Sequence, residues 1–464
     1  MPPRVALLLY FGLVAWLFYR DRRLYGRTSL ALWLPVIWLF IIASRPISTW
    51  FGVAPGEDPL EGSPLDRLFF LSLIAVSATV LVQRNLDWPG IVRNNGWLVI
   101  FFLYLAISIS WSDFPFVAFK RWIKDVGNVF MVLVVLTDAN PLRAVRIVWS
   151  RCCYLVIPLS VVLIKYFPNF GSYYDAFTGR PYYCGVTTDK NMLGMTLFAC
   201  GLSLVFILFD LSSRKNSKRL DYCIFLVLIA LVVWLLHKAQ SSTAIGCMIF
   251  SALVFFGLRF ATIRRKIATL GTWSVVIVAF LLILNWMFNL AELGTGLLGR
   301  DMTLSGRTEI WRRVLLEDIN PLVGAGYNSF WLGDRIAHVS AGYVGGGINE
   351  AHNAFIQTYL NGGWIGLLLL IALLLSAGSR IKRHAMTGEP FGAFRLTCFL
   401  ASIPYGMTEA IYNGLSPIWF LLLLIIVEPL SLRRFQSQFA NRSKTSGPMR
   451  PVQTPHLVRF CNVM

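Results

Sequence analysis

Apolar and polar positions alternate along the chain in long blocks, so that hydrophobic runs are separated by short charged loops. A helix needs roughly 20 predominantly apolar residues to cross a bilayer, and runs of this kind predict about 12 or 13 transmembrane helices. The runs from 119 and 392 are the weakest, because charged residues interrupt them. The predicted spans are 4–19, 29–46, 66–83, 96–111, 119–137, 146–166, 191–211, 220–237, 243–260, 269–288, 363–379, 392–411 and 416–432.

This pattern predicts an all-α polytopic membrane protein with one long loop. A transmembrane platform is expected over 1–288, a loop with short helices over 289–362, and C-terminal transmembrane helices over 363–432. The last stretch, 433–464, is basic, rich in Ser, Thr, Pro and Gln, and without apolar periodicity. It is expected to be a disordered cytoplasmic tail.

Composition agrees with lipid as the main solvent. Of the 464 residues, 56% are hydrophobic and only 14% are charged, with a mean hydropathy of +0.63. Soluble proteins carry about 25% charged residues, so a soluble protein is excluded. The apolar stretch from Met1 to Phe18 is followed by Arg20, Asp21 and further arginines rather than by small residues. It therefore predicts a first transmembrane helix and not a cleavable signal peptide.

The net charge of +19 is explained by orientation in the membrane. Cations cluster in alternate loops, and the positive-inside rule places those loops in the cytoplasm. The long interval 289–362 then lies outside, where its five Arg and Lys against seven Asp and Glu fit an exoplasmic face. Nucleic acid is therefore not expected as a partner. With 13 spans the N-terminus is outside, and with 12 it is inside.

The eight cysteines do not indicate a cofactor. Six of them lie in apolar stretches, and their spacings match neither zinc nor iron–sulfur patterns. The sequence thus predicts no metal site and no cofactor.

Cations on the predicted outer face are the first candidates for chemistry. They are Lys120, Arg121 and Lys124 at the start of one span, Arg180 and Lys190 in an outer loop, and Arg300, Arg307, Arg312 and Arg313 in the long loop. The positive-inside rule disfavours such positions, so an anionic ligand such as pyrophosphate would explain them. For any single cation, pairing with a nearby acid is the favoured alternative, with Asp125, Asp189, Asp301 and Glu309 as partners. For the whole set, the ligand is the better explanation.

The segment from Gly306 predicts a helix that ends at Asn320-Pro321. Ile310, Trp311, Val314 and Leu315 give it an apolar stripe. Arg307 then stands at the helix N-terminus, where backbone N–H groups and the guanidinium together favour an anion. A packed surface helix without a ligand explains the same pattern equally well.

His352 is the candidate general base, because an imidazole titrates near neutral pH. Glu350 and Asn353 are the neighbours that could orient it. A hydrogen-bonded structural histidine is the common alternative. Lys190 and Asn191 stand where an outer loop enters a span and could hold a phosphate or a sugar hydroxyl, whereas capping and snorkelling are the alternative roles.

These residues together resemble a known family. His352-Asn353 followed by Gly363 and Gly366 is similar to the signature of the O-antigen ligase and polysaccharide polymerase superfamily. The segment 298–311 (LGRDMTLSGRTEIW) resembles the exopolysaccharide-production branch, as do Gly185…Asp189-Lys190-Asn191…Gly194 and Ser110-Trp111-Ser112…Pro115. The resemblance covers roughly residues 100–430.

The resemblance implies a bacterial inner-membrane glycosyltransferase that works without a metal ion on the periplasmic face. It would move a glycan from undecaprenyl diphosphate to an acceptor hydroxyl, with Arg307 on the diphosphate and His352 as the base. Arg300, Lys190, Asn191, Asn353 and the cluster Lys120, Arg121 and Lys124 are the expected substrate-binding residues. The chain departs from the family at 240–244 (QSSTA), where a basic residue is usual, so one diphosphate contact is expected either to be lost or to move to Lys190 or to the 120–124 cluster.

Exopolysaccharide polymerisation is the expected reaction, and transfer of O-antigen to lipid A-core is the alternative within the family. A lipid-linked glycan flippase or transporter is the alternative from another class, but it would place charges near the bilayer midplane. A non-catalytic scaffold is a third. Expected partners are the lipid-linked donor, a glycan or lipid acceptor, membrane lipids and other polysaccharide-assembly proteins.

Overall fold

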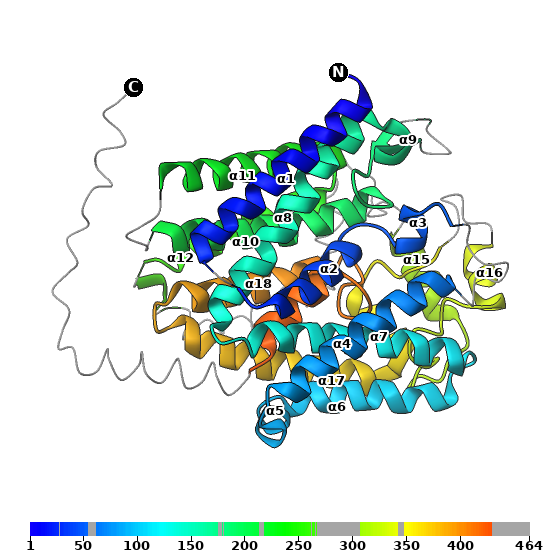
Figure 1. The fold of residues 1–464 in the computed structure, drawn as a ribbon. Coiled ribbons are helices and arrows are strands. Elements are labelled where there is room, and N and C mark those ends of the chain that lie inside the picture. Colours follow the sequence, from blue (N-terminus) through cyan, green and yellow to red (C-terminus); the bar gives the residue numbers. More distant parts are fainter. Residues whose placement is uncertain are drawn as a thin grey trace, which may run out of the picture.

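A computed structural model describes residues 1–26, 28–53, 62–174, 179, 181–212, 218–260, 262–264, 266, 307–341 and 348–428. The chain forms a bundle of helices (Figure 1). On one side lie α1, α8, α10, α11 and α12, and on the other lie α4, α6 and α7, with α18 and α19 packed between the two groups.

The helices and strands have the following bounds. The first half comprises α1 (Pro3–Tyr25), η1 (Leu30–Leu32), α2 (Trp33–Ile42), α3 (Ile47–Trp50), α4 (Pro64–Gln83), α5 (Trp88–Asn94), α6 (Gly96–Ile107), η2 (Ser108–Trp111), α7 (Pro115–Leu136), α8 (Pro141–Tyr166), α9 (Pro168–Gly171), β1 (Ser172–Tyr174) and β2 (Pro181–Tyr183). The second half comprises α10 (Lys190–Ser212), α11 (Arg219–Ala239), α12 (Ser242–Gly257), α15 (Arg307–Leu316), α16 (Asp334–Ser340), α17 (Ala354–Ala385), α18 (Pro390–Gly406) and α19 (Pro417–Ile426).

A helix occupies every predicted span except 269–288, which lies outside the described residues. Six of the described helices are long and apolar enough to cross a membrane, and the pair α5 and α6–η2, bent by 91°, brings this to 7. Three more apolar helices are shorter. The prediction of a polytopic helical membrane protein is therefore confirmed.

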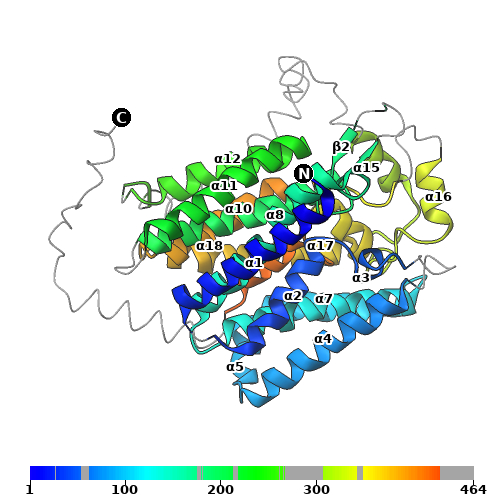
Figure 2. The same cartoon turned by 45° about the horizontal axis from the view of Figure 1, so that its top comes forward.

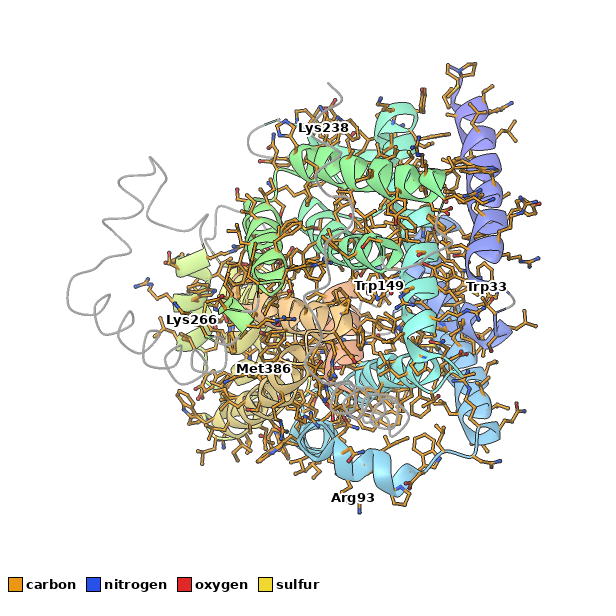
Figure 3. All side chains as sticks on the ribbon, turned by 90° about the vertical axis from the view of Figure 1, so that its left-hand side faces the viewer. Trp33, Arg93, Trp149, Lys238, Lys266 and Met386 are labelled. Atoms are coloured by element: carbon orange, nitrogen blue, oxygen red, sulfur yellow. The ribbon has the colours of Figure 1, made fainter. Side chains whose placement is uncertain are left out.

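The bundle buries large aromatic side chains and leaves apolar side chains on its outside. Trp149 is 1% exposed and lies inside the bundle, whereas Arg93 lies at its edge (Figure 3). Leu68 and Leu8 are about 70% exposed on α4 and α1, as expected for helices solvated by lipid.

A small hairpin is the one departure from an all-α fold among the described residues. Strands β1 and β2 pair antiparallel, with Tyr173 opposite Tyr182. The segment after them is anchored by Arg45, which donates to the Thr187 carbonyl oxygen at 3.0 Å from Nε and to the Gly185 carbonyl oxygen at 3.3 Å from Nη2. Arg45 thereby fixes the approach to α10, and with it the position of Lys190.

The short elements α3, α9, α15 and α16 gather at one end of the bundle (Figure 2). The described part of the long loop carries α15 and α16. The span predicted to begin at 363 begins earlier, at Ala354, because Asn353 caps the helix nine residues upstream. Gly363, with φ of 59°, marks a kink at the predicted start instead. The first turns of α17 therefore belong to the same end of the molecule as α15.

Candidate functional site

A polar cavity of about 830 Å³ opens at this end of the bundle. Segments far apart in sequence line it: α7, the start of α10, the loop before α17 and the loop before α19. Five predicted site residues are among its lining, namely Arg121, Lys124, Lys190, Asn191 and His352. The cations expected on one face thus converge with the candidate base around a single space.

Arg307 and His352 meet through a third residue that sequence reasoning missed. The Arg307 Nη2 atom donates to Glu409 Oε1 at 2.7 Å, and His352 Nδ1 lies 3.1 Å from Glu409 Oε2. The Glu409 side chain is only 4% exposed, whereas those of Arg307 and His352 are 18% and 24% exposed. One buried carboxylate therefore bridges the two residues predicted to be catalytic.

Glu409 lies in the turn that follows α18. An acidic residue at the end of an apolar run is costly unless it has a partner, and it is therefore often functional. That signal was present near the end of the predicted span 392–411, but Glu409 was not among the predicted site residues. The sequence alone gave no reason to pair it with Arg307, 102 positions away.

Local structure holds His352 in an unusual backbone conformation. Its φ is 45°, a left-handed value that non-glycine residues adopt only when their surroundings stabilise it. On its N-terminal side, the Ala351 carbonyl accepts a 2.8 Å hydrogen bond from Trp311 Nε1. On its C-terminal side, Asn353 Oδ1 accepts from the Phe355 amide at 3.0 Å and from the Ile356 amide at 3.1 Å. The imidazole is thus fixed between α15 and α17.

Asn353 is accordingly the N-cap of α17, and its Nδ2 atom donates to the Met407 carbonyl at 3.3 Å. Its predicted role in substrate binding stays a prediction. What the geometry adds is that Asn353 ties the His352 turn to the turn that carries Glu409.

The electrostatics of His352 are set by two carboxylates. Burial by itself would lower the pKa of the imidazole, but the hydrogen bonds and charges of Glu350 and Glu409 outweigh it and raise the pKa from 6.5 to about 9. Nδ1 lies 2.9 Å from Glu350 Oε1. The resting state at neutral pH is therefore an imidazolium held between two carboxylates, which differs from the neutral base expected from an ordinary pKa.

The same three side chains are the ones that could hold a metal ion within the described part of the chain. Glu350, His352 and Glu409 each offer one ligand atom, and these atoms lie within 4.8 Å of one another. A cation there would compete with the Arg307 guanidinium for Glu409. The donor set thus favours an ion pair with arginine over a metal centre.

Lys190 and Asn191 lie at the first turn of α10, where Asp189 acts as the cap. Asp189 Oδ1 accepts from the amides of Asn191 and Met192, each at 2.9 Å. The capping alternative therefore holds for Asp189. Lys190 Nζ lies 3.5 Å from the centroid of the Tyr182 ring, a cation–π contact that orients it on the rim of the cavity.

The cations of α7 do not pair with Asp125 as the alternative expected. The Asp125 carboxylate accepts instead from Tyr327 Oη at 2.8 Å and from Trp419 Nε1 at 2.7 Å. Arg121 donates to the Asn328 carbonyl at 2.5 Å, and Lys124 Nζ lies 5.2 Å from the Phe70 ring. Asp125 is thus a buried structural residue that holds the cavity wall together.

The remaining predicted positions lie elsewhere. Lys120 lines a neighbouring groove and not this cavity, with Nζ 4.8 Å from the Phe116 ring. Arg300 lies outside the described residues. Arg312 and Arg313 pair with Glu309 at 3.4 Å and 2.8 Å, so the acid-pairing alternative holds for those two.

The helix predicted after Gly306 is confirmed as α15. Ile310 and Val314 are buried, and Trp311 packs against them, whereas Leu315 is 53% exposed. The predicted stripe was therefore correct at three of its four positions and wrong at Leu315.

The segment that departs from the family pattern is the junction between α11 and α12. Gln240 has a left-handed φ of 52° and ends α11, and Ser241 Oγ accepts from the Ala244 amide at 3.4 Å to begin α12. Lys238 Nζ lies 5.3 Å from the Tyr183 ring and does not line the cavity.

Comparison with known proteins agrees with these features. The family model described as O-antigen ligase matches residues 225–371, a range that includes α15, His352 and the start of α17. The chain is also 26% identical over 325 residues to the exopolysaccharide production protein ExoQ of Rhizobium meliloti (strain 1021), covering 66% of this chain and 70% of that protein. The resemblance seen in the sequence is thereby confirmed. Residues 225–371 are thus similar to the O-antigen ligase family, and the described helices are those of a multi-pass membrane protein.

Proposed function

We propose that the protein transfers a glycan from undecaprenyl diphosphate to an acceptor hydroxyl at the polar cavity, and that the product is an exopolysaccharide. The observation that carries this proposal is the bridge from Arg307 through Glu409 to His352. Of these three residues His352 lines the cavity, together with the cations Arg121, Lys124 and Lys190. In this arrangement Arg307 can bind an anionic leaving group and His352 can accept a proton, and Glu409 links the two.

The diphosphate is the expected ligand of the cations. A departing diphosphate carries negative charge, and preorganised cations that stabilise it supply the largest share of catalysis in reactions of this kind. Arg121, Lys124 and Lys190 line the cavity. A guanidinium has five N–H donors, so Arg307 can keep its contact with Glu409 and still bind a phosphate oxygen. Arg300 is proposed to join this set.

His352 is proposed to take the proton of the acceptor hydroxyl. In the neutral ring, Nδ1–H donates to the carboxylates, and Nε2 carries the lone pair that accepts the proton. The hydroxyl oxygen forms a bond to the anomeric carbon as the bond from that carbon to the diphosphate oxygen breaks. Undecaprenyl diphosphate leaves with the electron pair. A pKa near 9 makes this base stronger but scarce at neutral pH.

The cavity is proposed to face the periplasm across the bacterial inner membrane. The positive-inside rule supports this side, because it places the outer-loop residues Lys190, Arg307 and His352 together outside. The name of the Rhizobium relative supports exopolysaccharide as the product class. No metal is needed in this scheme, since the cations supply the charge that a metal would supply elsewhere.

Reconstitution of the purified protein with undecaprenyl-diphosphate-linked glycan tests the proposal. Longer lipid-linked glycan without an added acceptor indicates a polymerase, and transfer only to added lipid A-core indicates a ligase. His352→Ala should abolish either product, with His338→Ala as the matched control on α16. Absence of any product from the wild-type protein would leave a scaffold or a transporter as the better account.

A further inference from the structure

We propose that the groove between α4 and α7 holds the isoprenoid chain of the lipid-linked donor. This inference rests on the proposed function, since it names the place of the donor's lipid part. The groove has a volume of about 390 Å³, and Phe70, Leu71 and Ile74 of α4 line it together with Phe116 and Phe119 of α7.

The groove and the polar cavity share two side chains. Arg121 and Lys124 line both spaces, so the apolar groove adjoins the cavity that contains His352 at two cations. A ligand with an apolar chain, an anionic centre and a polar head therefore fits these spaces in one order. Its chain lies in the groove, its diphosphate lies at Arg121 and Lys124, and its glycan lies in the cavity.

Charge at the groove also favours an anion. Arg67 and Lys120 line it in addition to the two shared cations. Among the described residues of its lining Asp66 is the one acidic side chain, and its carboxylate accepts from the Ser48 amide at 3.0 Å and from Ser48 Oγ at 2.6 Å. Aromatic rings hold two of the cations in place, as the contacts of Lys124 with Phe70 and of Lys120 with Phe116 show.

The apolar walls face the bilayer. Leu71, Phe116 and Phe119 are 48%, 67% and 47% exposed, so a chain can enter sideways from the lipid. A chain that leaves the bilayer for the groove gains little from the hydrophobic effect, because both surroundings are apolar. Binding in the groove is instead favoured by packing contacts. These contacts also fix the direction of the isoprenoid chain, which places the anomeric carbon at the same depth in every donor.

A phospholipid is the competing occupant. Its anionic head group would also bind the cations, but a phospholipid would leave the cavity of about 830 Å³ beside His352 unfilled. A glycan on a diphosphate fills groove and cavity together, and for this reason the donor is the proposed occupant.

Photo-crosslinking of the full-length protein in nanodiscs tests the groove. The probe is undecaprenyl diphosphate with a diazirine in its chain, and labelled peptides are mapped by mass spectrometry. Labelling is expected on 64–74 and 116–124. Leu71→Trp, which fills the groove, should reduce it about tenfold, a change that corresponds to the loss of about ten carbon–carbon contacts. Val76→Trp is the control, because Val76 is 50% exposed on α4 and does not line the groove.

Three results would overturn the inference. The first is labelling confined to other helices, and the second is equal labelling in both tryptophan variants. The third is labelling that phosphatidylglycerol removes as readily as unlabelled undecaprenyl diphosphate, which would mark a phospholipid site. Glycan transfer by the same wild-type sample separates the two proposals. Transfer with labelling elsewhere refutes only the groove, and absence of transfer refutes the proposed function.

Discussion

Glu409→Gln tests the contribution of the Glu409 charge separately from the contributions of Arg307 and His352. The amide keeps the size of the side chain and one acceptor oxygen, but it removes the negative charge between Arg307 and His352. Because Glu409 is buried, water cannot replace that charge. The variant is therefore expected to keep an intact cavity that binds donor and acceptor, but to lose the charged link between Arg307 and His352.

The size of the effect follows from the imidazole. A pKa raised from 6.5 to about 9 corresponds to roughly 3 kcal/mol of net stabilisation of the imidazolium. Glu350 and Glu409 share it, so loss of one charge should lower the His352 pKa by about one or more. A hydrogen bond to a charged group contributes about 1.5–3 kcal/mol, so the loss of the charged contact to Arg307 should slow transfer roughly ten- to hundredfold.

The assay has two readouts and a matched control. Nuclear magnetic resonance of ¹⁵N-labelled histidine follows the His352 pKa, with His352→Gln as the assignment reference. Initial rates of glycan transfer are measured on the same reconstituted samples. Glu350→Gln is the control, because Glu350 contacts His352 at 2.9 Å on the side that faces the cavity and has no described contact with Arg307.

Both variants should lower the pKa, but Glu409→Gln should slow transfer more than Glu350→Gln. Equal rates in the two variants would show that the link to Arg307 contributes nothing. An unchanged His352 pKa in Glu409→Gln would refute the bridge itself.

Four further predictions concern pH, metal and fold. Transfer should accelerate as pH rises toward about 9, because His352 must lose its proton to act as a base; a rate that falls over this range would assign the imidazolium to diphosphate binding. The pKa of His352 in the folded protein lies above 6.5, so the imidazolium stabilises the fold. In thermal unfolding, wild type should therefore be more stable than His352→Gln below about pH 6.5, and this difference should disappear as the pH rises through about 9. EDTA should leave the rate unchanged, and a loss restored by one divalent cation would contradict this. Gly363→Ala should destabilise the protein by about 1–3 kcal/mol in thermal unfolding, because its φ is 59° and an added Cβ would lie 2.2 Å from the Leu322 carbonyl carbon; Gly246→Ala, with no atom within 4 Å, should not.

Local features of the fold could be predicted from the sequence. Long apolar runs have few alternatives to helices in lipid, since every backbone group must be paired internally. The helix α15 was predicted from its apolar stripe, and it ends at Leu316, before the predicted stop at Asn320-Pro321. The start of α17 was misplaced because an apolar run was equated with a helix. The polar turns before Gly363 are helical too, since Asn353 caps them.

Site residues could be predicted where a charged or titratable side chain stood at a position that membrane topology disfavours. Cations on the outer face and a histidine after a long loop were such conflicts. Glu409 was missed because its partners Arg307 and His352 lie 102 and 57 positions away, and Arg45 was missed because Thr187 lies 142 positions away. Asp125 was expected to balance nearby cations, but Tyr327 and Trp419 satisfy it from distant segments instead. Tertiary packing decides which acidic side chain pairs with which partner, and the hydrophobic periodicity of the sequence does not predict these pairs.

The most direct test of the account is the initial transfer rate of Arg307→Lys in proteoliposomes with saturating undecaprenyl-diphosphate-linked glycan. Lysine keeps the charge but loses the planar fork that contacts Glu409 and a phosphate oxygen together. The predicted result is a fall of about a hundredfold, with Arg312→Lys unchanged, because that side chain is 73% exposed. A rate for Arg307→Lys within a factor of about two of wild type would contradict the proposal that Arg307 holds the leaving diphosphate.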